Sequence, residues 1–290
     1  MDTGDFSEQQ ILDLMNLAVT LKACIRADYY PPLLKKKCIA FSVEGAEPFF
    51  AMMLETAVHQ LGGHAQKVDL ALEEPESFRE TALQLDRCCD LAFVRCPRHE
   101  TLLALAKYAN IPIVNGGSGY ALPVQEVADL ITMFEHLPRE KKLEECKLVY
   151  DGPACPRCTS ALFAASKIGM QFVQLVREKK GELQPPVLKQ AERNVKKSGG
   201  TYTVTDNSAE AYLSADFLIM DGPLRQKLPP DANGVLRLDP AENRLAAFRS
   251  VLTCMLYAHP AMREPMLIEK MKRMLAVKLQ TIFGFGEAGE

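Results

Sequence analysis

The sequence lacks several features that would assign it quickly to a class of protein. It has no tryptophan, and its formal net charge of -3 over 290 residues reveals no basic excess. No apolar run reaches the ~18 residues that a membrane-spanning helix needs. Without a basic excess, a general electrostatic attraction to nucleic acid or to an anionic membrane is not expected. We therefore expect no nucleic-acid partner and no membrane partner.

A secretory pattern is also missing. Residues 1–5 are acidic, whereas a signal peptide begins with a basic and then an apolar stretch. The nine cysteines, an odd number, are therefore expected to be reduced thiols of a cytoplasmic protein. The 48% hydrophobic and 24% charged content is typical of a globular chain.

What the chain does contain is a regular alternation of short apolar strands and amphipathic helices. In the first half we expect strands at 38–43, 65–70, 91–95 and 111–114, with helices at 8–23, 48–61, 75–87, 99–109 and 123–137. In the second half we expect strands at 146–150, 171–176, 201–205, 217–220 and 235–238, with helices at 157–169, 187–198, 208–214, 241–257 and 262–282. This order predicts an α/β fold with two parallel sheets, each covered by helices on both faces.

A charged connector at 140–145 is the expected boundary between two domains. It separates a first domain at 1–138 from a second at 146–245. The remaining segment, 246–290, is expected to form helices that pack back on the first domain.

The turn at 43–51 joins the first predicted strand to a helix. Such a turn commonly holds an anion, because the N-terminus of a helix has free N–H groups and a partial positive charge. Here the turn carries two glutamates and two phenylalanines, and no basic or hydroxyl residue follows Ser42. The position therefore suits a phosphate, but the side chains do not.

A series of segments, in order and at matching spacing, carries a resemblance to a known family. They are Arg95 and residues 60–65, 99–102, 105–109, 111–116, 123–132, 198–200, 205–206, 215–216 and 241–245. Together they resemble the aspartate/ornithine carbamoyltransferase family, and its ornithine branch more closely.

The resemblance implies two α/β domains with a ligand cleft between them. One domain would bind carbamoyl phosphate, and the other would bind an amino acid whose amine attacks the carbamoyl carbon. Charge then develops on the carbonyl oxygen and on the leaving phosphate, so cations and hydrogen-bond donors are needed at both. The resemblance also implies a homo-oligomer, most commonly a trimer, and no cofactor is expected.

The chain departs from the family's motifs at the places where the phosphate would bind. The family's Ser-Thr-Arg-Thr-Arg loop is replaced by Glu47, Pro48, Phe49, Phe50 and Ala51. Losing one bidentate arginine from an anion costs about 2–5 kcal/mol, and two are lost. The histidine of the His-Pro-x-Gln motif is Leu122 here, and the motifs for ornithine are incomplete after Asp221.

Three polar residues remain as candidate ligand contacts. Arg95 ends a predicted strand, where it either meets an anion or pairs with a nearby glutamate. Gln125 lies in the first turn of its helix and either faces the cleft or supports the structure. Asn115 opens a glycine-rich loop, which either cradles a ligand or forms only a turn.

The cysteines suggest a separate site. Cys155 and Cys158 are spaced as a Cys-x-x-Cys pair before a predicted helix, and Cys96 follows Arg95. The pair is expected to face the cleft and Cys96 to lie at its opposite rim, so the three thiols could converge. They are either a metal or redox site, since a helix N-terminus lowers the pKa of a thiol, or free thiols without a function.

These observations leave three hypotheses for function. The preferred one is a carbamoyltransferase-like protein that has lost catalysis and keeps a binding, regulatory or scaffolding role, with an amino acid or a carbamoyl-type compound as its ligand. The second is a divergent but active carbamoyltransferase that transfers a carbamoyl-type group to an amino acid amine. The third is a thiol-based metal or redox protein.

Overall fold

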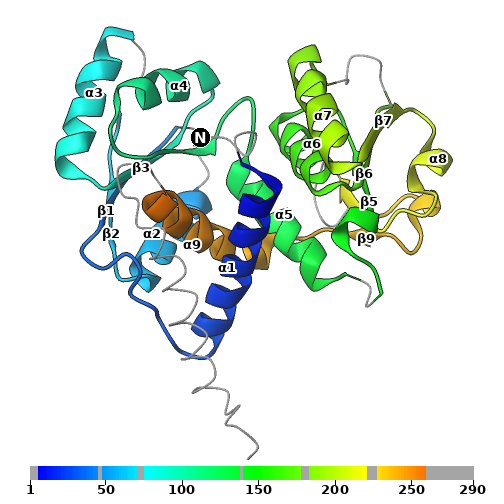
Figure 1. Ribbon diagram of the computed structural model, residues 1–290, viewed down its shortest axis with the longest axis horizontal. Helices are drawn as coiled ribbons and strands as arrows, with labels where there is room; N and C mark the ends of the chain where they lie inside the picture. Colours follow the sequence, from blue (N-terminus) through cyan, green and yellow to red (C-terminus); the bar gives the residue numbers. More distant parts are fainter. Residues whose placement is uncertain are drawn as a thin grey trace, which may run out of the picture. The chain divides into compact units, whose positions relative to one another are not determined.

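The computed structural model describes residues 6–44, 48–70, 75–137, 140–177, 183–220 and 227–258. The chain contains two parallel sheets flanked by helices, as Figure 1 shows, so the predicted α/β class is confirmed. It divides into two compact units. Among the described residues, the first-sheet unit contains those within 14–95, 100–114 and 245–258, and the second-sheet unit contains those within 6–13, 96–99 and 115–244. The predicted domain boundaries remain a prediction.

The first sheet has the strand order β2-β1-β3-β4. Its strands are β1 (Cys38–Val43), β2 (His64–Lys67), β3 (Leu91–Arg95) and β4 (Ile113–Gly117). The helices of this part of the chain are α1 (Glu8–Arg26), α2 (Pro48–Gln60), α3 (Pro75–Cys88) and α4 (His99–Tyr108). Right-handed connections place α3 and α4 on one face of the sheet and α2 on the other (Figure 1).

The two central strands of this sheet, β1 and β3, consist mainly of consecutive apolar residues and not of alternating apolar and polar ones. Residues 39–41 of β1 and 91–94 of β3 are all buried, as expected of a parallel sheet covered on both faces. In register, Ile39 lies opposite Leu91 and Val43 opposite Arg95. The two strands therefore end at the same edge of the sheet.

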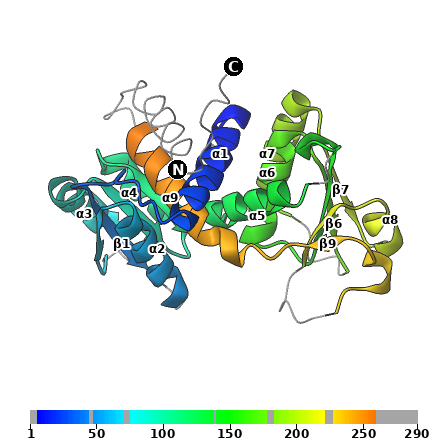
Figure 2. The same ribbon diagram turned by 90° about the horizontal axis from the view of Figure 1, so that it is seen from below.

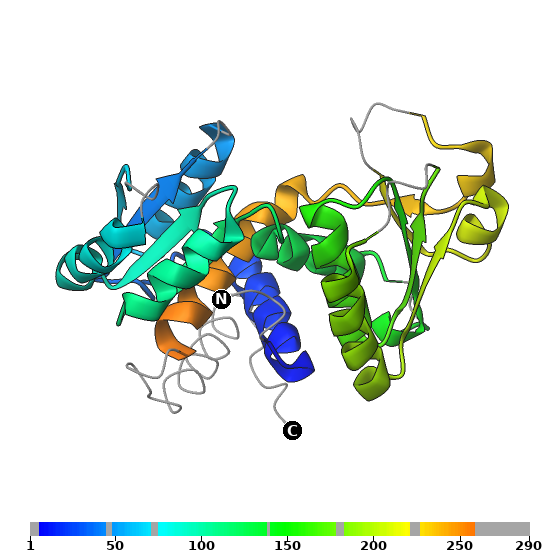
Figure 3. The same ribbon diagram turned by 90° about the horizontal axis from the view of Figure 1, so that it is seen from above.

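The second sheet has the strand order β7-β6-β5-β8-β9. Its strands are β5 (Lys147–Asp151), β6 (Gln171–Leu175), β7 (Thr201–Thr205), β8 (Phe217–Met220) and β9 (Leu236–Arg237). The helices that follow β4 in the chain are α5 (Pro123–Glu135), η2 (Leu143–Glu145), α6 (Pro156–Ile168), α7 (Pro185–Ser198), α8 (Ser208–Tyr212), η4 (Pro230–Ala232) and α9 (Ala241–Ala258). Most of α9 belongs to the first-sheet unit. Helices α6 and α7 cover one face of the sheet and α8 lies on the other (Figures 2 and 3).

The predicted elements agree with the structure except at their ends. The largest shift is in β4, which was predicted at 111–114 but begins at Ile113 and continues to Gly117. It begins late because Pro112 has no N–H for a ladder, and it continues to Gly117, whose carbonyl accepts the Cys96 N–H at 3.2 Å. The predicted helix at 262–282 lies outside the described residues. No described helix has both the length and the apolar character needed to cross a membrane.

Candidate functional site

The carboxyl ends of β1 and β3 form the switch point of the first sheet. The chain leaves these neighbouring strands toward opposite faces, and ligands of parallel sheets commonly bind at such a point. The Glu44 N–H donates to the carbonyl oxygen of Arg95 at 3.0 Å, which ties the two strand ends together. Helix α2 begins four residues after Glu44, at Pro48.

The first turn of α2 is apolar, and one of its side chains belongs to the core. Phe50 is only 6% exposed, and its ring centroid lies 5.8 Å from that of Phe93 and 5.0 Å from that of Phe248. The Arg95 guanidinium carbon lies 5.1 Å from the centre of the Phe50 ring, within range of a cation–π interaction. Arg95 thus lies over an aromatic ring at the place where the resemblance implies an anion.

The side chains of Pro48, Phe49 and Ala51, beside Phe50 in this turn, have no hydrogen-bond donor. Phe49 is 69% exposed, Ala51 is half-buried, and Pro48 has no backbone N–H to offer. Glu47 lies outside the described residues. The predicted loss of phosphate-binding side chains from this turn rests on residue types alone. In the structure, Phe50 packs in the core and Phe49 is exposed.

The start of α5 differs from the start of α2. Leu122 occupies the N-cap position without a side-chain cap, and Pro123 is the first helical residue. The Leu122 N–H donates instead to the Ser160 hydroxyl of α6 at 2.8 Å. The first turn of α5 carries Gln125, whose side chain bonds to side chains of α5 and α9.

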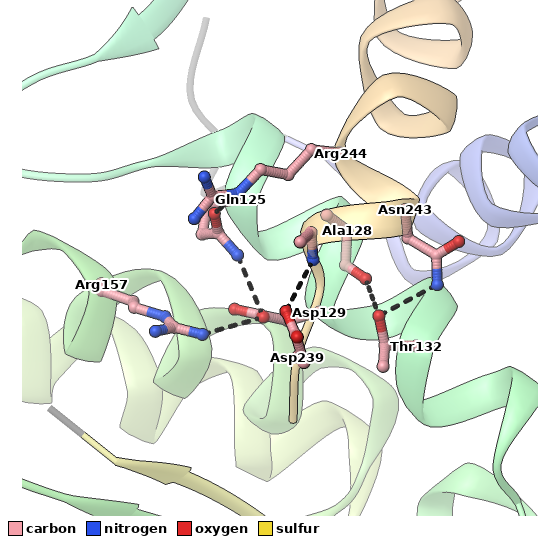
Figure 4. Close-up of polar contacts among 9 residues, drawn as sticks. Gln125, Ala128, Asp129, Thr132, Arg157, Asp239, Asn243 and Arg244 are labelled. Carbon is pink, nitrogen blue, oxygen red and sulfur yellow. Dashed lines mark hydrogen bonds and ion pairs between the residues drawn. The ribbon is translucent and has the colours of Figure 1, made fainter. Parts of the chain in front are cut away.

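Four side chains form what we call the Gln125 cluster: Gln125 and Asp129 of α5, Arg157 of α6 and Arg244 of α9 (Figure 4). The Gln125 Nε2 donates to the Asp129 carboxylate at 3.1 Å, and Arg157 donates to the same carboxylate oxygen at 3.1 Å. The Arg244 Nε donates to the Gln125 Oε1 at 2.8 Å. Both ends of the Gln125 carboxamide are therefore bonded to side chains of the chain itself.

The cluster is buried around its carboxylate. Asp129 is 3% exposed, and burial raises its pKa above the usual range, against the opposing effect of the Arg157 cation. The ion pair with Arg157 favours the ionised carboxylate, since a buried carboxylate is tolerated when it is paired and hydrogen-bonded. An external carbonyl group at this position would have to replace one of these internal bonds.

A second set of contacts fixes the start of α9 on α5. The Asn243 Nδ2 donates to the Thr132 hydroxyl at 3.0 Å and to the Glu135 carboxylate at 2.8 Å (Figure 4). The Thr132 hydroxyl in turn donates to the Ala128 carbonyl at 2.7 Å. These contacts hold Arg244 at the position from which it reaches Gln125.

Asn115 lies inside the turn that it opens. It is 1% exposed, its Oδ1 accepts the Gly117 N–H at 2.8 Å, and its Nδ2 donates to the Ser118 hydroxyl at 3.4 Å. The Ser118 hydroxyl also lies 3.1 Å from Nδ1 of His99. The side chain therefore stabilises the loop, and its role in ligand binding remains a prediction.

The three predicted cysteines have different surroundings. Cys155 is the N-cap of α6, and its sulfur lies 3.0 Å from the Tyr150 hydroxyl. Cys158 is buried, and burial raises the pKa of its thiol, which disfavours the reactive thiolate. Cys96 is also buried and donates to the Arg98 carbonyl at 3.2 Å.

The described residues give no support to the hypothesis that the cysteines hold a metal ion. Among them, no group of three or more His, Cys, Asp and Glu side chains is arranged to hold a metal ion. The redox role of the Cys155–Cys158 pair remains a prediction.

Several residues of these sites were not singled out from the sequence. Asp129 and Arg244 lie in the segments 123–132 and 241–245 that carry the family resemblance, which is the signal that could have found them. Arg157 lies between the two cysteines of the Cys-x-x-Cys pair. Asp151 ends β5, where it accepts bonds from the Tyr212 hydroxyl at 2.6 Å and from Arg177 at 3.1 Å.

Comparisons with known proteins agree with the resemblance. Residues 1–135 match the family model for the carbamoyl-P binding domain of aspartate/ornithine carbamoyltransferase. The chain is 33% identical over 220 residues to an ornithine carbamoyltransferase of Campylobacter curvus, over 75% of this chain and 70% of the relative. It is 33% identical over 232 residues to a putrescine carbamoyltransferase of Mycoplasma capricolum subsp. capricolum. That match covers 76% of this chain, which thus spans only 63% of the relative's length.

Solved structures of similar proteins have the same fold. The ornithine carbamoyltransferase of Pyrococcus furiosus is 25% identical with a TM-score of 0.75, over 86% of this chain and 94% of that one. The ornithine carbamoyltransferase of Thermus thermophilus is 26% identical with a TM-score of 0.75, over 88% and 97% of the two chains.

Proposed function

Because this chain belongs to the aspartate/ornithine carbamoyltransferase family, we propose that it is a member that no longer transfers a carbamoyl group and keeps a binding, regulatory or scaffolding role. The observation that carries the proposal is the first turn of α2, where Phe50 is a core residue and Arg95 lies over its ring. Carbamoyl transfer from a phosphorylated donor depends on cations aimed at the phosphate.

The cost of the missing cations supports this proposal over the divergent active enzyme. The two positions that the resemblance assigns to arginines hold Phe49 and Ala51. Each missing guanidinium costs about 2–5 kcal/mol of binding free energy, so the affinity for carbamoyl phosphate would fall by several orders of magnitude.

The ligand that fits this proposal is small and lacks a phosphate. The Gln125 cluster retains two guanidinium groups, one carboxylate and one carboxamide, which suit an amino acid or a carbamoyl-type compound. The relatives' names make ornithine and putrescine the first amines to test. By the same resemblance we expect a homo-oligomer, with a trimer as the specific expectation.

A direct assay tests the proposal. The chain is incubated with carbamoyl phosphate and either ornithine or putrescine, and the carbamoylated amine is measured. We expect no product above the reaction without protein. Product formation that Arg95→Ala abolishes would overturn the proposal and favour the divergent active enzyme.

A matched pair of variants tests whether the two missing guanidinium groups are the reason why phosphate is not bound. Phe49→Arg with Ala51→Arg returns two guanidinium groups to the first turn and leaves the buried Phe50 in place. Phe49→Gln with Ala51→Gln adds polar side chains without charge. We expect only the arginine variant to gain affinity for inorganic phosphate, and equal affinity of both variants would argue against the missing cations as the cause.

A further inference from the structure

A cluster of three cysteines lies at the other end of the first sheet, away from the switch point. Cys38 is the first residue of β1, Cys88 is the last residue of α3, and Cys89 follows it. Parallel strands put their amino ends at one edge of the sheet and their carboxyl ends at the opposite edge. The cluster is therefore separate from the turn at the start of α2.

Backbone and side-chain bonds hold Cys38 beside the segment that contains Cys89. The Asp90 N–H donates to the Cys38 carbonyl at 2.9 Å, and the Cys38 N–H donates to the Asp90 carboxylate at 2.8 Å. The Lys37 ammonium pairs with the same carboxylate at 2.7 Å. The Cys38 thiol lies close enough to the Cys89 thiol to raise the pKa of Cys89. Their sulfur atoms are thus neighbours although the residues are far apart in sequence.

The cluster is also accessible to small molecules. Cys88 is exposed, and Cys38 and Cys89 are half-buried. By contrast, Cys24, Cys96, Cys146 and Cys158 are buried. A small oxidant that diffuses to the surface therefore meets this cluster before it meets those four thiols.

We propose that Cys38 and Cys89 are an oxidation site at which a hydroperoxide converts the two thiols into an intramolecular disulfide. The Cys38 sulfur attacks the peroxide oxygen, the O–O bond breaks, and a sulfenic acid forms as water or an alcohol leaves. The Cys89 sulfur then attacks the Cys38 sulfur, the S–O bond breaks, and a second water leaves. Two thiols are oxidised by two electrons in total, and one peroxide is reduced.

The order of the two steps follows from the surroundings of Cys89. Burial raises the pKa of the Cys89 thiol to about 12, and the neighbouring Cys38 adds to this effect. A thiol of this kind reacts slowly with a peroxide in solution. It acts second, because attack on a sulfur atom that is already in contact benefits from proximity.

The disulfide would enclose a long segment of the first-sheet unit. The closed loop runs from the start of β1 through α2 and β2 to the end of α3. Closing a loop of this length reduces the entropy of the unfolded chain, so the oxidised protein should melt at a higher temperature. The modification would therefore change the stability of the helix whose first turn defines the candidate site.

Peptide mapping tests the proposal without any variant. Trypsin cleaves after Lys37, Lys67, Arg87 and Arg95, so Cys38 lies in the peptide 38–67, and Cys88 and Cys89 lie in the peptide 88–95. After treatment of the whole chain with hydrogen peroxide, we expect these two peptides to be linked in a digest without reductant. Their combined mass should be lower by two hydrogen atoms, and reductant should separate them. Absence of the linked peptide overturns the proposal.

Variants identify which sulfur atoms form the bond. Cys88→Ser should keep the linked peptide and the higher melting temperature, whereas Cys89→Ser should lose both. If the link persists in Cys89→Ser and disappears in Cys88→Ser, the exposed Cys88 is the partner and the assignment is wrong.

The same digest provides an internal comparison with the Cys-x-x-Cys pair. Cleavage after Arg157 puts Cys155 and Cys158 in separate peptides. We expect these peptides to remain unlinked at peroxide concentrations that link 38–67 to 88–95. The opposite selectivity would overturn the proposal and support the redox role predicted for the Cys155–Cys158 pair.

Discussion

The starts of α2 and α5 are two versions of the same local structure with different side chains. Each helix has a proline as its first residue, and each follows a strand of the first sheet in the chain. In the resemblance, each corresponds to a contact with carbamoyl phosphate. At α2 the Phe50 ring packs on Phe248 in the core, whereas at α5 the Gln125 side chain bonds to Asp129 and Arg244. The two helix starts therefore offer different side chains to a ligand.

The sharpest test of this contrast compares two neighbouring phenylalanines of α2. Phe50→Ala removes a buried ring from contact with Phe93 and Phe248, so we expect a loss of about 3–5 kcal/mol in the free energy of unfolding. Phe49→Ala removes an exposed ring and should change it by less than about 0.5 kcal/mol. Urea denaturation measures both, and similar losses would contradict the assignment of Phe50 to the core.

The second effect concerns the ion pair in the Gln125 cluster. Asp129→Ala leaves the Arg157 guanidinium without its carboxylate, and removal of one partner of a buried pair costs about 3 kcal/mol. Arg157→Ala together with Asp129→Ala should cost less than the sum of the two single changes. If the losses of unfolding free energy in the two single variants add up to that of the double variant, Asp129 and Arg157 do not stabilise each other.

A smaller effect is expected from the carboxamide of Gln125. Gln125→Leu removes its bonds to Arg244 and Asp129, so we expect the unfolding free energy to fall by about 1–2 kcal/mol. Gln66→Leu is the matched change at an exposed glutamine of β2 and should have little effect. Equal melting temperatures of the two variants would indicate that Gln125 is not bonded internally and is available to a ligand.

The smallest expected effect is a pH dependence of stability that comes from Cys89, near the amino end of β1. Burial raises the pKa of Cys89 from 9.0 to about 12, so in the unfolded chain this thiol ionises at a lower pH than in the folded one. The unfolding free energy of the reduced protein should therefore fall as the pH rises above about 9, by less than ~1.4 kcal/mol per pH unit because the thiol is partly solvated. Cys89→Ala should flatten this dependence, and an unchanged slope would assign it to other groups.

Much of the fold follows from local patterns in the sequence. The strands β1, β3, β7 and β8 were predicted to the residue, because short apolar or β-branched runs end at charged, glycine or turn residues. The apolar residues at 48–51 were also visible as residue types. That Phe50 packs on Phe248, nearly two hundred residues away in the chain, could not be read from periodicity, because both faces of the α2 start look apolar in sequence.

The rest of the site depends on contacts between distant segments. Arg244 and Gln125 are 119 residues apart, and Arg157 and Asp129 are 28 residues apart. A single sequence does not reveal such partners, since many acidic and basic side chains could pair equally well. The Cys38–Cys89 contact was missed for the same reason, because the Cys-x-x-Cys spacing favours a pair that is close in sequence.

The central claim is that the start of α2 no longer binds a phosphorylated donor. Isothermal titration of the full chain with carbamoyl phosphate measures this directly, with the Phe49→Arg and Ala51→Arg double variant as the positive comparison. We predict no saturable heat for the natural chain up to millimolar ligand and measurable binding for the variant. Saturable binding by the natural chain that Arg95→Ala removes would contradict the account and show that Arg95 still holds the donor.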